Sequence, residues 1–148
     1  MKLLIILTAA IFLMVSTSIS QELGVRFGNV TGGHVAIDGI VGLGEFSRVH
    51  GDVSFYSGGV GVEGLWNFIY RPLSKEGFDY YVGAGPFVWL QSPFGFGAAG
   101  ELGLDYHFKD APISLSADWR PSWQLVDHSN FDADIFGFNV RYVFNSGK

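Results

Sequence analysis

The sequence predicts an all-β fold: an eight-stranded antiparallel up-and-down barrel whose strands cross a membrane. Three observations predict it. Eight segments alternate apolar with polar or glycine residues at period two, which is the pattern of a strand with two unlike faces. Glycine supplies 21 of the 148 residues and aromatic residues 16% of the chain. Finally, the charged residues of these segments share one face, so we expect that face inside the barrel.

The predicted strands follow one another with short connections. A strand and its turn recur about every 15 residues, close to the spacing of spanning strands of roughly 9–11 residues joined by short turns. No second domain, linker or low-complexity tract interrupts this repeat. We place the strands at residues 22–30, 34–43, 46–55, 60–70, 78–90, 96–108, 112–123 and 135–144.

Glycine-rich turns join the first strands. Residues 31–33 (TGG) and 56–59 (YSGG) predict tight hairpins. Period-two alternation places His34 on the inner face of the second strand, where Ile40 is an apolar exception. The strand at 46–55 has the clearest contrast between its two faces. The connection at residues 71–77 is longer and polar.

The middle strands are less regular. Leu65 and Ile69 give the fourth strand a mixed inner face, and both faces of the fifth are apolar near its end. Proline cannot donate to a strand ladder, so we expect bulges at Pro86 and Pro121. The stretch at 126–134 is predicted to be a polar connection, and Asp134 is the charge nearest to the apolar face.

The last strand is the one that closes the barrel. Its outward face is apolar: Phe136, Phe138, Val140, Tyr142 and Phe144. An unpaired strand edge cannot be hydrated in hydrocarbon, so the last strand is expected to pair with the first.

The predicted interior is polar and ion-paired. An eight-stranded barrel is just wide enough for side chains to fill it, whereas a lipid-facing Arg or Lys at the midplane costs about 2–4 kcal/mol. The simplest interpretation is a hydrated plug of paired charges. The predicted network consists of Arg26, Asp38, Arg48, His50, Asp52, Glu63, Glu101, Asp105, His107, Asp118, Arg120 and Arg141.

An even number of strands leaves both chain ends on one side, which we take as periplasmic. Aromatic residues cluster at that rim, as expected of a girdle at the membrane interface. The alternative is ordinary strand aromatics, which are common in any sheet. The predicted girdle is Tyr70, Tyr80, Tyr106, Phe108, Tyr142 and Phe144.

The N-terminal residues 1–20 have the pattern of a secretory signal peptide. Lys2 precedes an apolar run over residues 3–15, and Ser18 and Ser20 are small residues at plausible cleavage positions. A membrane-anchor helix is the alternative, but the run is short for a span of about 20 residues. Residues 21–148 then form the mature barrel.

Three stretches resemble small outer-membrane barrels of the OmpA/OmpX type, and more closely the short, uncharacterised barrels of Bacteroidetes. They are residues 100–108 (GELGLDYHF), 117–121 (ADWRP) and 138–144 (FNVRYVF). The resemblance implies a location in the outer membrane and insertion by the barrel-assembly machinery. It supplies no catalytic residues.

No enzymatic site is evident. The neighbours His50 and Asp52, or Asp105 and His107, could be acid–base pairs, but no nucleophile with a base and an orienting group stands out. Residues 127–130 (DHSN) resemble the residue types of lipid-hydrolysing barrels, although contiguous residues seldom form a triad. No metal or cofactor motif is present in the sequence. We therefore expect no enzyme, cofactor or metal.

These observations predict an integral outer-membrane protein with a structural role in the envelope. Its expected partners are outer-membrane lipid and, during insertion, the barrel-assembly machinery, and we expect a monomer. The net charge of −5 gives no basic footprint for nucleic acid. The alternatives are a lipid-modifying enzyme, a secreted lipocalin-like binding barrel, and a narrow porin-like pore.

Overall fold

The alternating segments form strands in a computed structural model that describes residues 21–31, 33–56, 58–126 and 128–144. The predicted signal peptide lies outside these residues. The strands are β1 (Gln21–Val30), β2 (Gly33–Gly42), β3 (Arg48–Tyr56), β4 (Gly59–Pro72), β5 (Phe78–Leu90), β6 (Gly95–His107), β7 (Ile113–Trp119), β8 (Ser122–Gln124), β9 (Asn130–Asp132) and β10 (Phe136–Val143).

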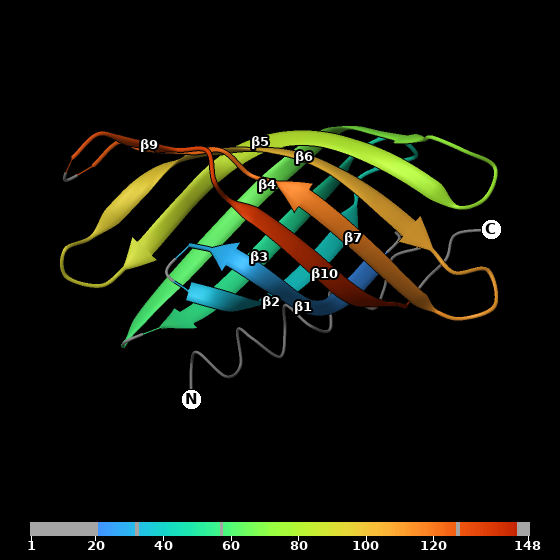
Figure 1. Ribbon diagram of the computed structural model, residues 1–148, viewed down its shortest axis with the longest axis horizontal. Helices are drawn as coiled ribbons and strands as arrows, with labels where there is room; N and C mark the ends of the chain where they lie inside the picture. Colours follow the sequence, from blue (N-terminus) through green and yellow to red (C-terminus); the bar gives the residue numbers. More distant parts are fainter. Residues whose placement is uncertain (1–20, 32, 57, 127, 145–148) are drawn as a thin grey trace.

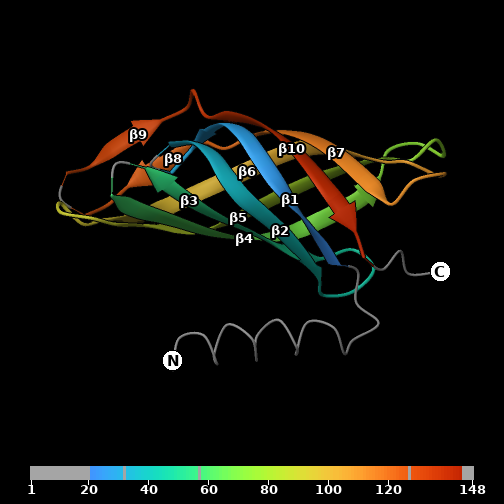
Figure 2. The same ribbon diagram turned by 90° about the horizontal axis from the view of Figure 1, so that it is seen from below.

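Eight of these strands close into an antiparallel barrel. β1 to β7 pair in sequence order, and β10 pairs with both β7 and β1 (Figures 1 and 2). The closing ladder runs from Glu22 opposite Val143 to Gly28 opposite Gly137. The predicted pairing of the last strand with the first is therefore confirmed. At the β3–β4 hairpin, Tyr56 lies opposite Gly59, and Gly58 has the positive φ of 80° that glycine tolerates.

The remaining two strands form a hairpin that extends one end of the barrel (Figure 1). The predicted seventh strand is interrupted at Arg120 and Pro121, giving β7 and β8, and β8 pairs with β9. The register with β6 is unchanged across the interruption, so the bulge expected at Pro121 does not form. The bulge expected at Pro86 is also absent, because the β5–β6 register runs through it unshifted. The predicted loop at 126–134 contains β9.

A register shift in β4 corrects one girdle assignment. Asn67 lies opposite Gly83, but Ile69 lies opposite Val82. The extra residue exchanges the two faces, so Ile69 is exposed and Tyr70 turns inward. There the Tyr70 hydroxyl donates to Asp79 Oδ2 at 3.1 Å. The predictions that Tyr70 belongs to an outer girdle and that Ile69 faces inward are therefore wrong.

The other predicted girdle residues stay on the outer wall. Tyr106 and Phe108 are in edge-to-face contact with ring centroids 4.9 Å apart, and Tyr142 and Phe144 make a similar contact at 4.9 Å. Tyr80 lies opposite the exposed Leu104.

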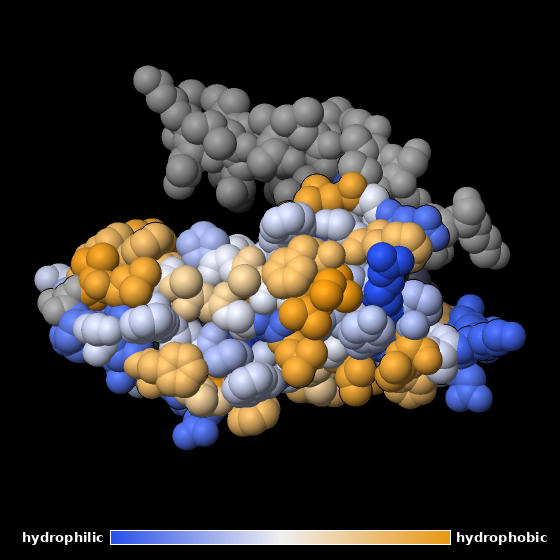
Figure 3. Space-filling model, turned by 90° about the horizontal axis from the view of Figure 1, so that it is seen from above, coloured by the Kyte–Doolittle hydropathy of each residue, from blue (hydrophilic) through white to orange (hydrophobic). Residues whose placement is uncertain are grey.

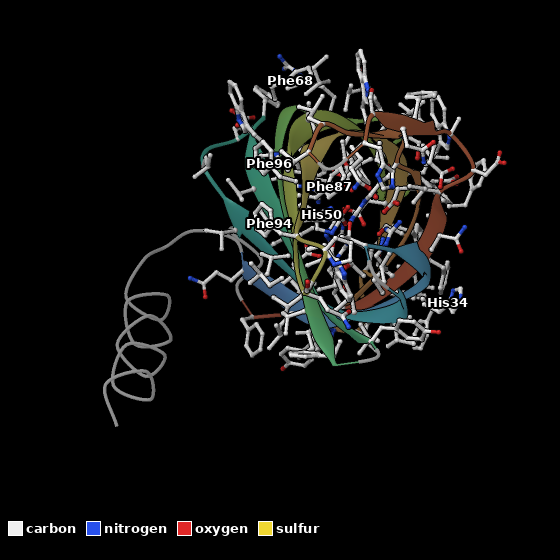
Figure 4. All side chains as sticks on the ribbon, turned by 90° about the vertical axis from the view of Figure 1, so that its left-hand side faces the viewer. His34, His50, Phe68, Phe87, Phe94 and Phe96 are labelled. Atoms are coloured by element: carbon white, nitrogen blue, oxygen red, sulfur yellow. The ribbon has the colours of Figure 1, made fainter. Side chains whose placement is uncertain are left out.

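His34 was predicted on the inner face but lies outside the ring of strands (Figure 4). The β1–β2 register shifts between Phe27 and Val30, beside this residue, which breaks the alternation on which the prediction relied.

The distribution of polar and hydrophobic side chains is the reverse of that in a water-soluble protein: polar side chains are buried and many large hydrophobic ones are exposed. Among the described residues, seven hydrophobic side chains are buried, whereas seventeen polar or charged ones are. Large hydrophobic side chains are instead exposed on the outer wall, for example Trp66 at 55% and Leu102 at 50%. On the face seen in Figure 3, hydrophobic residues lie among paler ones, and hydrophilic residues gather toward the ends. The described residues contain no helix long and apolar enough to cross a membrane.

The exposed charges avoid the middle of that wall. They occupy turns, the last residues of β4, and the region of β9. Among the described residues, the exposed acidic and basic side chains other than histidine are Glu45, Arg71, Lys75, Glu76, Lys109, Asp110, Asp132 and Asp134.

Candidate functional site

A network of ion pairs fills the barrel interior. Eleven of the twelve predicted network residues are buried, and His107 is half-buried at one rim. The strands bring them together because alternate residues of each strand point inward. The interior also holds polar residues that were not in the predicted network: Glu22, Asn67, Tyr81, Ser114, Ser116 and Asn139.

Arg120 has the most carboxylate partners. Its Nη1 pairs with Asp52 and, at 2.9 Å, with Glu63 Oε2. Its Nη2 lies 2.8 Å from Glu101 Oε1, and its Nε lies 3.4 Å from Asp118 Oδ1. Four carboxylates from four strands thus converge on one guanidinium group, which joins opposite sides of the wall.

Two more arginines extend the network toward the rim where β1 begins and β10 ends. Arg141 pairs through Nε with Asp38 and through Nη1 with Asp105 Oδ1 at 3.3 Å. Arg48 donates from Nη1 to Asp105 Oδ2 at 2.5 Å. Its guanidinium also lies over the rings of Tyr70 and Tyr81, at 4.2 and 4.5 Å, in cation–π geometry.

Arg26 joins the network through Asp118, the carboxylate that also contacts Arg120. Arg26 Nη1 donates to Asp118 Oδ1 at 2.5 Å and Oδ2 at 2.7 Å. The same carboxylate accepts from Asn139 Nδ2 at 2.9 Å and from the Tyr81 hydroxyl at 3.2 Å. Neutral donors therefore complete the coordination of a buried carboxylate, as desolvation requires.

His50 lies at the centre of the interior (Figure 4). Its Nε2 pairs with Asp38, and its Nδ1 lies 2.7 Å from Glu101 Oε1. Both ring nitrogens therefore face carboxylates. Asp38 lies on the neighbouring strand β2 and Glu101 on β6 across the interior, whereas the acid–base pair considered from the sequence was with Asp52.

His107 makes similar cross-strand contacts at the rim. Its Nε2 lies 2.9 Å from Glu22 Oε1, and its Nδ1 lies 3.3 Å from Asp79 Oδ2. Ser114 donates to the other oxygen of Glu22 at 2.6 Å. The pairing with Asp105 considered from the sequence is again replaced by contacts across strands.

Three groups of histidine and carboxylates have ligand atoms close enough together to suggest a cation site: Asp38, His50 and Asp52; His50, Glu101 and Asp118; and Glu22, Asp105 and His107. Guanidinium groups already occupy these positions. Arg120 and Arg141 each place Nη2 within 3.2 Å of His50 nitrogens, and Arg141 contacts both Glu22 and Asp105. Such cations would repel a divalent ion, so the convergence is explained by the ion pairs.

The DHSN stretch lies in the β8–β9 hairpin, apart from the network. Asp127 is outside the described residues. His128 is exposed, and Ser129 Oγ accepts from the indole of Trp123 at 2.8 Å. The sequence-based prediction that the chain is not an enzyme stays a prediction.

Small residues in the wall make room for the network. A Cβ on Gly103 would lie 2.2 Å from Tyr81 Cζ, and one on Gly137 would lie 2.2 Å from Arg26 Cζ. Real atoms cannot approach so closely. Only glycine at these two positions leaves the space that the side chains of Tyr81 and Arg26 occupy.

We expect Gly103→Ala to destabilise the barrel by about 1–3 kcal/mol, because the added methyl group overpacks a filled interior. Gly64→Ala is the matched control, since a Cβ there meets nothing within 4 Å. Urea unfolding of the two variants, followed by tryptophan fluorescence, measures the difference. Equal unfolding midpoints would show that Tyr81 can move aside.

A comparison of the chain with models of known protein families and with curated proteins finds no match. The functional interpretation therefore depends on the geometry of the barrel itself.

Proposed function

We propose that this chain is an integral outer-membrane β-barrel with a structural role in the envelope. The supporting observation is the inverted wall: buried ion pairs inside and large hydrophobic side chains, including Phe138 at 46% exposed, outside. In water, an apolar surface that encircles the molecule far exceeds what a soluble monomer leaves exposed. In a bilayer the same surface is matched by the acyl chains.

The closed ladder supports the same proposal. A bilayer offers no water to unpaired backbone groups, so a spanning sheet must have no edge. Here β1 and β10 remove the edge, with seven opposed residue pairs from Glu22–Val143 to Gly28–Gly137.

A lipocalin-like binding barrel is the second candidate, because it too has eight closed strands. Such a barrel needs an apolar cavity inside and a polar wall outside. The middle of this interior is instead occupied by Arg120, His50 and Arg141 with their carboxylates. That arrangement favours a filled interior over a ligand cavity, and over the aqueous path that a porin-like channel needs.

The proposal includes export by the signal peptide and insertion by the barrel-assembly machinery. The exposed outer face of β10, with Phe138, Val140 and Tyr142, supports recognition of the last strand. Since β10 completes the ring within one chain, a monomer suffices.

The first test is to refold residues 21–148 into detergent and compare heated and unheated samples by gel electrophoresis. We expect a heat-dependent change in mobility, because a closed barrel resists the detergent until it is boiled. In cells, the protein should stay with the membrane after carbonate extraction. A mature chain that remains monomeric and folded in water would contradict the membrane location.

Tryptophan quenching tests which face meets lipid. Two single-tryptophan variants retain either Trp66, which is 55% exposed on the wall, or Trp89, which is half-buried on the inner side of β5. In vesicles containing brominated lipid, we expect strong quenching of Trp66 and weak quenching of Trp89. The reverse order would favour a water-soluble barrel.

A further inference from the structure

A pocket of about 490 Å³ lies at the end of the barrel where the β1–β2, β5–β6 and β8–β9 connections meet. Figure 4 looks at the molecule from this end. The volume is within the range of roughly 300–1,000 Å³ typical of small-molecule sites, and barrel mouths are a preferred place for them. Nothing in the envelope role described above uses this pocket.

Two inward-facing aromatic residues of β5, Phe87 and Trp89, line the pocket. Phe87 is 7% exposed, with its ring inside the circle of strands (Figure 4). The two strands beside β5 leave room for the rings: a Cβ on Gly97 of β6 would lie 2.6 Å from Phe87 Cζ, and one on Gly59 of β4 would lie 2.4 Å from Trp89 Cζ2. The aromatic surface is therefore held in a defined place.

The β1–β2 turn separates the pocket from the charge network. Thr31 Oγ1 donates to Glu63 Oε1 at 2.9 Å, and Ser54 Oγ donates to the Thr31 carbonyl oxygen. A Cβ on Gly61 would overlap the same carbonyl, so the turn crosses the end of the interior. Thr31 also lines the pocket, so this residue lies between the pocket and Glu63 of the charge network.

Most of the other lining side chains are polar, beside the apolar Val30, Pro93 and Ile135. The polar ones include the amides of Gln124 and Asn130, the hydroxyl of Ser122 and one carboxylate, Asp132. Amides and hydroxyls both donate and accept hydrogen bonds. The described lining residues include no Lys or Arg, and His128 is the one basic side chain among them, beside the carboxylate of Asp132. The arginine or lysine groups that usually hold phosphate are therefore missing from this lining.

We infer that this pocket binds a neutral saccharide. A sugar ring presents apolar C–H groups on its faces, which pack against Trp89 and Phe87, and hydroxyl groups at its edge, which pair with amide, hydroxyl and carboxylate groups. A cationic amine is the competing ligand, since Trp rings and Asp132 would also attract it. The mixed donors and acceptors around the rim favour the saccharide, because a quaternary ammonium group uses none of them.

The test is isothermal titration of the refolded protein with cellobiose, maltose and chitobiose. The detergent is lauryldimethylamine oxide, which carries neither a sugar nor a choline group that would compete. We expect saturable binding of at least one disaccharide. Trp89→Ala should weaken it at least about tenfold, or 1.4 kcal/mol. Trp66→Ala is the control that removes an indole from the outer wall.

Three further measurements separate the alternatives. Asn130→Ala, in the exposed hairpin, tests the rim without altering the barrel wall and should weaken binding even if Trp89→Ala fails to fold. Asp132→Asn should retain the saccharide, whereas it would abolish binding of a cation. Tetramethylammonium and inorganic phosphate are the comparison ligands, and neither should bind.

Binding of tetramethylammonium or phosphate in place of the disaccharides overturns the inference, as does disaccharide binding that both Trp89→Ala and Asn130→Ala leave unchanged. Absence of any disaccharide binding by the folded protein also overturns it. The inference is separate from the membrane location, because a chain that proved water-soluble could be titrated without detergent.

Discussion

Replacing Arg120 with Gln should lower the free energy of unfolding by about 3–5 kcal/mol, the largest effect expected of any single substitution in the interior. The side chain is fully buried and contacts four carboxylates: Asp52, Glu63, Glu101 and Asp118. Without the guanidinium group, these carboxylates repel one another in a space that water reaches poorly. A neutral amide can donate to at most two of them.

Equilibrium urea unfolding in detergent measures this loss, with heat-dependent gel mobility as a check that the ring has closed. Arg71→Gln is the matched control, because Arg71 is exposed at the end of β4 and should change stability by less than about 0.5 kcal/mol. A loss below about 1 kcal/mol for Arg120→Gln would mean that water or protonated carboxylates replace the cation readily, and that the interior is not a tightly paired plug.

Leu102→Arg should destabilise the protein in lipid vesicles by about 2–4 kcal/mol, because its side chain projects from the middle of β6 into the proposed hydrocarbon layer. Leu102 is 50% exposed and lies opposite the outward-facing Val82 and Trp119. An arginine there must pull its charge toward the headgroups or carry water inward.

Phe131→Arg is the control for this substitution. Phe131 is 63% exposed in β9, on the hairpin outside the closed ring. The proposed membrane does not cover that hairpin, so the change should cost less than about 0.5 kcal/mol. If both variants are equally stable in vesicles, the outer wall does not meet hydrocarbon and the proposed location fails.

Much of the fold could be predicted from the sequence because side chains alternate strictly along a strand. That regularity separates Arg48, His50 and Asp52 from Val49 and Val53, and their burial follows it. It also predicts that the barrel closes. The last strand has the same alternation as the others, and its free edge can pair only with the first strand. The apolar exceptions Leu65 and Ile40 are buried as their positions predict.

Register shifts set the limit of such reasoning. One extra residue between Asn67 and Ile69 exchanges the faces of β4, and no proline or glycine marks the place. The prolines did not mark register shifts. Pro86 lies within the β5–β6 ladder and Pro121 between β7 and β8, and the register with β6 is unshifted at both places. A missing donor removes one hydrogen bond without requiring an additional residue in the strand.

The members of the charge network could be predicted, but their partners could not. Partners depend on the stagger of eight strands around the ring, which brings Arg26 to Asp118 across 92 positions of sequence. The pocket was missed as well, although it left a signal. Phe87 and Trp89 gave β5 an apolar inner face beside its glycines, which is unusual in an interior otherwise filled with charge.

The hydrogen bond from Phe144 N to Gln21 O, 2.9 Å long, has a consequence for the connectivity of the chain. The two residues are neighbours at one rim, so a short linker could join them while new ends are opened between β3 and β4, at Gly58. Such a circular permutant should form the same barrel, because each strand pairs only with the two strands beside it, and these pairs do not depend on where the chain begins. The position of the chain ends would then affect export of the protein but not the geometry of the folded barrel.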